Sequence, residues 1–186
     1  SVVTSSDTPR AQREACPRLA TRGPGTCIAA IGLGGTTVKK LAERHLEKLL
    51  DLLNERLTFE RMAVKLYDDI LAKIHEGDLP SVAGISAVFG QMKEYRNQEK
   101  EHEEWLEEQI RALGGDAHAR TEMSELVERE SRGVTEIVEK DSELTHLLHA
   151  LQTAELVDDT GWKLLLELAD EADDDEAREQ FRKRAE

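Results

Sequence analysis

Four ionisable residues occupy positions where the helical pattern of the sequence calls for apolar side chains. Glu60 falls on the apolar stripe of one predicted helix, Glu99 and His102 fall on that of a second, and Glu155 falls on that of a third. Residues three and four apart share one face of a helix. The pattern therefore directs three carboxyl groups and one imidazole from separate helices into the same interior.

Carboxyl groups gathered in an apolar interior need protons or a cation, because burial and mutual repulsion both penalise their charged forms. A bound metal ion removes both penalties, since it accepts carboxylate and imidazole ligands. Glu99 and His102 stand one helical turn apart and can reach the same ion. This mixed ligand set suits iron or manganese better than structural zinc or calcium.

The spacing Glu-x-x-His is by itself weak evidence for a metal site. Composition gives roughly 0.8 such matches by chance, and the sequence contains two, the second being Glu143-x-x-His146. His146 falls on the polar side of its predicted helix, so we interpret the second match as a surface feature. The alternative for the first match is that the helix phase is misassigned and that its side chains face solvent.

The elements that would position these residues are amphipathic helices. Only 4 residues are proline and only 4% are aromatic, a composition that favours helix. We predict an all-α fold, an antiparallel four-helix bundle at residues 37–186 that follows a flexible leader at 1–36. The predicted helices cover 37–74, 85–113, 142–172 and, truncated at the end of the sequence, 176–186, with a connecting helix or an exposed excursion at 119–141. The stripe predicted for the second helix contains Val88, Met92, Tyr95, Leu106, Ile110 and Leu113.

Charge and cysteine content exclude several classes of protein. The net charge of -14, from 39 acidic and 25 basic side chains, repels nucleic acid and anionic membranes. Cys16 and Cys27 form no CxxC pair, which excludes a zinc ribbon or a rubredoxin-type iron site. No apolar run reaches the ~20 residues that span a bilayer. We expect a cytoplasmic protein.

Three segments resemble the helices of bacterioferritins and rubrerythrins, which belong to the ferritin-like superfamily. The first segment is Leu53-Asn54-x-x-Leu57-x-x-Glu60-x-x-Ala63-x-x-x-Tyr67. The second is Glu99-x-x-His102 with the exit turn Leu113-Gly114-Gly115-Asp116, and the third is Thr153-Ala154-Glu155 with Trp162. The resemblance covers residues 46–186.

This resemblance implies a centre of two iron ions, or of two manganese ions. Glu60 would be a terminal ligand, Glu99 a bridging ligand and His102 its imidazole partner, while Glu155 would bind the other ion. The family pattern also calls for a second Glu-x-x-His on the fourth helix. Glu186 is the candidate for its glutamate, and no histidine follows it in this sequence.

The implied activity is oxidoreductase chemistry in which Fe(II) reacts with O2 or peroxide, as in a ferroxidase or a peroxidase. Tyr67 would be either a hydrogen-bond donor to the ligands or a tyrosine at the edge of the core. A peroxidase would need an external electron donor, and we expect a homo-oligomer, in the simplest case a dimer. Two alternatives stay open: a reaction like that of manganese catalase, and a non-catalytic helical scaffold or oligomerisation module.

Overall fold

The computed structural model describes residues 35–75, 85–141 and 143–185. Most of the predicted leader and the predicted ligand Glu186 lie outside these ranges. The described residues form six helices and no strand, which confirms the predicted all-α fold. The helices are α1 (Lys39–His75), α2 (Ile85–Ala112), α3 (Glu122–Glu130), α4 (Arg132–Lys140), α5 (Leu144–Glu171) and α6 (Asp175–Ala185).

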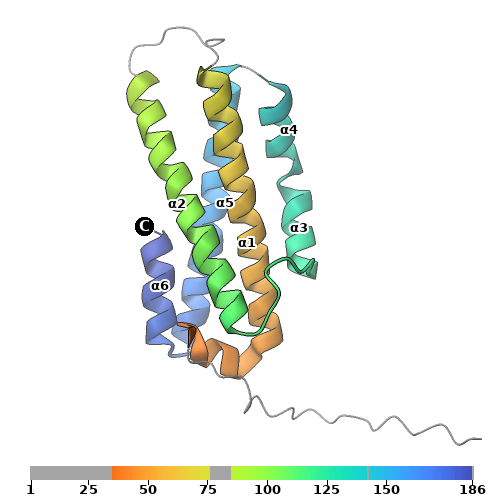
Figure 1. Ribbon diagram of the computed structural model, residues 1–186, viewed down its shortest axis with the longest axis vertical. Coiled ribbons are helices and arrows are strands. Elements are labelled where there is room, and N and C mark those ends of the chain that lie inside the picture. Colours follow the sequence, from red (N-terminus) through yellow and green to blue (C-terminus); the bar gives the residue numbers. More distant parts are fainter. Residues whose placement is uncertain (1–34, 76–84, 142, 186) are drawn as a thin grey trace, which may run out of the picture. The chain divides into compact units, whose positions relative to one another are not determined.

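The helices are arranged with one long crossover. Helices α1 and α2 lie side by side and run in opposite directions (Figure 1). The short helices α3 and α4 then lead the chain back along α1, so that α5 runs in the same direction as α2, and α6 turns back along α5. The crossover was predicted as a connecting helix or an exposed excursion, and it is a pair of helices that pack on α1 and α5. Helical bundles of the ferritin type have one such crossover.

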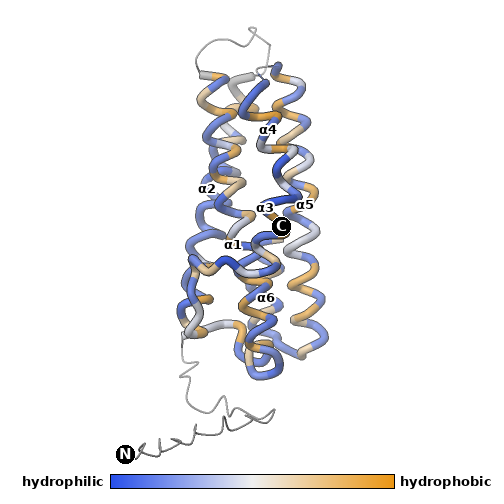
Figure 2. The backbone as a smooth tube through the Cα atoms, turned by 90° about the vertical axis from the view of Figure 1, so that its right-hand side faces the viewer, coloured by the Kyte–Doolittle hydropathy of each residue, from blue (hydrophilic) through white to orange (hydrophobic). Residues whose placement is uncertain are grey.

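Two apolar clusters fill the interior, because each long helix buries one stripe and exposes the other residues to water. Figure 2 shows hydrophobic and hydrophilic residues interspersed along the helices, as amphipathic helices require. Along α1, Leu57 belongs to the first cluster and Ala63 and Tyr67 belong to the second. Glu60 lies between them, so the buried ionisable residues separate the two clusters.

The predicted stripe of the second helix was wrong at two residues. Val88 and Tyr95 are 38% and 39% exposed, whereas Met92 is buried. The reason is that α2 packs mainly on α1, so side chains that point away from α1 stay uncovered. The first helix was predicted without a break, but the backbone at His45 is not helical (φ -150°, ψ 63°) and bends α1.

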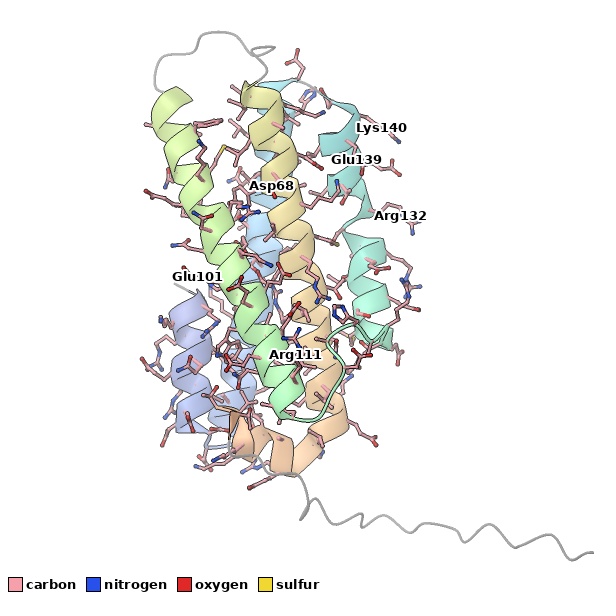
Figure 3. All side chains as sticks on the ribbon, viewed as in Figure 1. Asp68, Glu101, Arg111, Arg132, Glu139 and Lys140 are labelled. Atoms are coloured by element: carbon pink, nitrogen blue, oxygen red, sulfur yellow. The ribbon has the colours of Figure 1, made fainter. Side chains whose placement is uncertain are left out.

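Charged side chains cover the outer faces of the helices. Figure 3 shows Arg132, Glu139 and Lys140 on the outer side of α4, and all three are exposed. Asp68 of α1 pairs with Arg96 of α2 at 3.0 Å between Oδ1 and Nε. In the described part of the chain, no helix is long and apolar enough to cross a membrane.

Asp174 fixes the starts of two helices at once. Its Oδ2 accepts hydrogen bonds from the backbone N–H groups of Lys40 and Leu41 in the first turn of α1, at 2.9 and 3.2 Å. Its Oδ1 accepts one from the N–H of Ala177 in the first turn of α6, at 3.2 Å. These N–H groups have no partner within their own helices.

We expect Asp174→Ala to lower the free energy of unfolding by about 2 kcal/mol, because one side chain caps two helices at about 1 kcal/mol each. Urea denaturation followed by circular dichroism measures this loss. Asp170→Ala is the control, since Asp170 is exposed and pairs only at the surface with Arg178, where an ion pair contributes less than about 1 kcal/mol. Equal losses in both variants would contradict the capping role.

Candidate metal centre

Three of the predicted ligands lie together in the interior. Nδ1 of His102 lies 3.8 Å from Oε2 of Glu60 and 3.9 Å from Oε2 of Glu99. One ligand atom from each residue lies within 4.8 Å of the other two. Glu60 is fully buried, Glu99 is 5% exposed, and the side chain of His102 is 16% exposed. The phase of the first two helices was therefore predicted correctly at these residues.

The atoms that face one another lack other partners. Oε2 of Glu60, Oε2 of Glu99 and Nδ1 of His102 are buried and form no hydrogen bond. Buried polar atoms in native proteins are nearly always satisfied, so three orphaned atoms at one point need an explanation. Two carboxylates and one imidazole are a ligand set for a transition metal, and such an ion would satisfy all three atoms. The residues present therefore fit one metal ion.

Glu155 faces the same interior but has a partner of its own. The hydroxyl of Tyr67 donates a hydrogen bond to Oε1 of Glu155 at 2.7 Å. Tyr67 is fully buried, so it is a donor to one of the predicted ligands. The role of Glu155 as a metal ligand stays a prediction. Glu186 lies outside the described residues, and the described part of α6 adds no residue to the group of three.

Two ionisable residues of the interior were missed by the sequence analysis. Arg56 is 1% exposed, and its Nη2 pairs with Oε1 of Glu60 at 3.0 Å and with Asp158 of α5. We call the six residues Arg56, Glu60, Glu99, His102, Glu155 and Asp158 the polar layer. The helical spacing could have indicated both residues. Arg56 lies four residues before Glu60, and Asp158 lies three residues after Glu155, so each shares a helix face with a residue that was predicted to point inward.

The pKa values in the polar layer reflect burial and crowding. Burial raises the pKa of Glu99 to about 11, and the adjacent carboxylate of Glu60 adds to the shift. Burial also raises the pKa of Glu60, but contacts with Glu99 and His102 and the charge of Arg56 outweigh it and lower this pKa to about 2. Burial and the charge of Glu60 raise the pKa of Asp158 to about 8. Without a metal ion, the pair of Glu60 and Glu99 therefore favours holding a proton at neutral pH, and Glu99 is the more basic of the two.

Aromatic rings enclose His102 on the side of α5 and α6. The ring of Trp162 meets the imidazole edge to face at 5.3 Å between centroids, and Phe181 lies 6.3 Å from Trp162. A cavity of about 210 Å³ adjoins His102 and is lined by Gln98, Glu101, His102, Lys183 and Arg184. His102 is thus the residue of the group of three that lies nearest to solvent.

The high pKa of Glu99 predicts a pH dependence of stability for the metal-free protein. Between its pKa in the unfolded chain, 4.5, and about 11 in the fold, the folded state holds a proton that the unfolded state has released. Stability therefore falls as the pH rises through this range. Glu99→Gln, which is neutral at every pH, should make this fall shallower between about pH 6 and pH 9, measured by urea denaturation with a chelator.

Glu104→Gln is the matched control, because Glu104 is exposed on the same helix and should keep the pH dependence of the original chain. Glu60 affects a different range, since its lowered pKa costs stability only as the pH falls from 4.5 toward about 2. An unchanged slope in Glu99→Gln would show that Glu99 is not protonated in the fold.

Gly161 leaves the space that Arg56 fills. A Cβ atom at Gly161 would lie 1.9 Å from Nη1 and 2.7 Å from Cζ of Arg56. We expect Gly161→Ala to destabilise the protein by about 1–3 kcal/mol in thermal or urea unfolding, because the added methyl group overpacks the interior. Gly90→Ala in α2 is the control, since nothing lies within 4 Å of its Cβ position. It should instead stabilise the protein by up to about 1 kcal/mol. Equal effects would contradict the close packing of Arg56.

Comparison with known proteins agrees with this architecture. Residues 48–181 match the family model of the ferritin-like domain. This range begins within α1, ends within α6 and contains every residue of the polar layer. Comparison with curated proteins and with solved structures found no match. The family model spans more than half of the chain, and the chain belongs to the ferritin-like domain family.

Proposed function

We propose that this chain binds Fe(II) at Glu60, Glu99 and His102 and oxidises it with O2 or peroxide. The observation that carries the proposal is the set of three orphaned atoms, which converge from two helices inside a fold of the ferritin-like family. Manganese suits the same ligands, and iron is the metal that the proposed oxidation requires as its substrate.

The ligand set favours the oxidised product over the substrate. Fe(III) carries one more positive charge than Fe(II), and two carboxylates in an interior of low dielectric stabilise the higher charge more strongly than water does. Oxidation of one Fe(II) at each of two such sites supplies two electrons, which with two protons reduce one O2 to H2O2. With H2O2 as the oxidant in place of O2, two electrons and two protons reduce one H2O2 to two molecules of water. With peroxide as the oxidant, an external electron donor would return the iron to Fe(II).

Residues around the ligands control protons and water. Glu99 must release the proton that its high pKa retains before both of its oxygens can serve as anionic ligands. The bond from Tyr67 keeps Glu155 directed into the interior. The rings of Trp162 and Phe181, both fully buried, keep water from the side of α5 and α6. Water exclusion of this kind strengthens the electrostatic effect of the carboxylates.

A second candidate is a ferritin-like scaffold or oligomerisation module without a working metal site. The observation in its favour is Arg56, whose charge neutralises Glu60 in the absence of any metal ion. Under this alternative the protonated Glu99 and the ion pair of Arg56 satisfy most of the polar layer. Metal binding separates the two candidates, because a scaffold would take up no iron.

We expect anaerobic Fe(II) titration to show saturable uptake, followed on aeration by the absorbance of Fe(III). The double variant Glu60→Ala with Glu99→Ala should lower uptake to background, because it removes both anionic ligands. The matched control is Glu143→Ala with His146→Ala, which destroys the other Glu-x-x-His at a surface position where His146 is 59% exposed. This control should bind and oxidise iron like the original chain. No saturable uptake by the original chain, with its helices intact by circular dichroism, would reject the proposal.

A further inference from the structure

Arg56 is held in the interior by two acidic side chains and two aromatic rings, while its Nε and Nη1 atoms form no hydrogen bond. Its guanidinium pairs with Glu60 of its own helix and with Asp158 of α5. It lies over the ring of Phe59, 4.7 Å from the centroid, and 5.4 Å from the centroid of Trp162. Transfer of a charged side chain from water into a protein interior is costly unless it is paired and hydrogen-bonded. Both acidic partners and both rings meet the positive charge of the guanidinium.

Gly161 shows that α5 is shaped around this side chain. A glycine inside a helix costs up to about 1 kcal/mol relative to alanine, and here any Cβ atom would collide with the guanidinium. Asp158 and Gly161 lie one turn apart on α5, so that helix presents an acidic partner and a gap side by side. The interior thus contains a site whose shape and charge fit a guanidinium group.

The guanidinium uses ligand atoms that a second metal ion would need. It engages Oε1 of Glu60 and the carboxylate of Asp158, which leaves Oε2 of Glu60, Oε2 of Glu99 and Nδ1 of His102 orphaned. Dinuclear centres of this fold class use four carboxylates and two histidines. A second cation beside Glu60 would be repelled by Arg56.

We propose that Arg56 is the permanent second cation of this centre, so that each chain binds one metal ion, at Glu60, Glu99 and His102, and not two. The proposal rests on the proposed function, since it concerns the number of ions in the same site. Glu60 is then shared: one oxygen belongs to the guanidinium and the other to the metal ion. Arg56 is a positioning residue, because it orients Glu60 and neutralises part of the charge.

The number of bound ions at saturation tests this inference. Purified chain is titrated anaerobically with Fe(II), and separately with Co(II), whose visible spectrum reports each site that fills. Elemental analysis after gel filtration gives the metal content per chain. We expect one ion per chain for the original sequence, one for Arg56→Lys, which keeps the charge, and two for Arg56→Met, which removes it. Arg61→Met is the control and should bind one ion, because Arg61 pairs with Glu103 and Glu107 outside the polar layer.

The outcomes distinguish the two proposals. No bound metal in the original chain would reject the proposed function and this inference together. Two ions in the original chain would reject this inference and leave the metal-binding function standing, and this result does not depend on whether any variant folds. One ion in the original chain and one in a folded Arg56→Met variant would also reject the inference, because Arg56 would not limit the number of ions.

Discussion

The constraint on which this structure depends is the crowding of four carboxyl groups in one layer between two apolar clusters, with Glu60 and Glu99 buried and Glu155 and Asp158 partly buried. Glu60 and Glu99 of that layer lie within reach of one histidine nitrogen, and Glu155 and Asp158 face them from α5. Such a group cannot be fully ionised in an interior of low dielectric. The protein meets the constraint in three ways: Glu99 holds a proton, Tyr67 donates to Glu155, and Arg56 pairs with Glu60 and Asp158.

These three solutions leave some buried polar atoms without hydrogen-bond partners. Five buried atoms of the layer stay without partners: Nε and Nη1 of Arg56, and the three that converge on one point from Glu60, Glu99 and His102. Fold stability alone gives no reason to keep such atoms, since replacement by apolar groups would remove their desolvation cost. A bound cation gives a reason, and the ferritin-like family of the chain agrees with it.

The sequence was sufficient for most of the fold and for the inward direction of Glu60, Glu99 and His102, because a period of 3.6 residues sets both the helices and the residues that they bury. It placed Glu60, Glu99 and His102 correctly, since each fills a slot in a stripe of apolar residues. It missed Arg56, although the same phase applies, because arginine is almost always exposed and its burial depends on Asp158 and Gly161 more than 100 residues later in the chain. The prediction that Tyr95 is buried was wrong for the opposite reason. The helical period gives the direction in which a side chain points but not whether another helix covers it.

The shared cap at Asp174 has a consequence for how the bundle assembles. One of its bonds joins residues 134 positions apart in the chain, so the cap at the start of α1 forms only after Lys40 and Asp174 have come together. Closing so long a loop carries an entropic cost that only later contacts offset. The bend at His45 lies between this anchored first turn and the rest of α1. The end of the bundle that contains the starts of α1 and α6 should therefore open and close as one cooperative unit. This unit is separate from the middle of α1, where the polar layer lies.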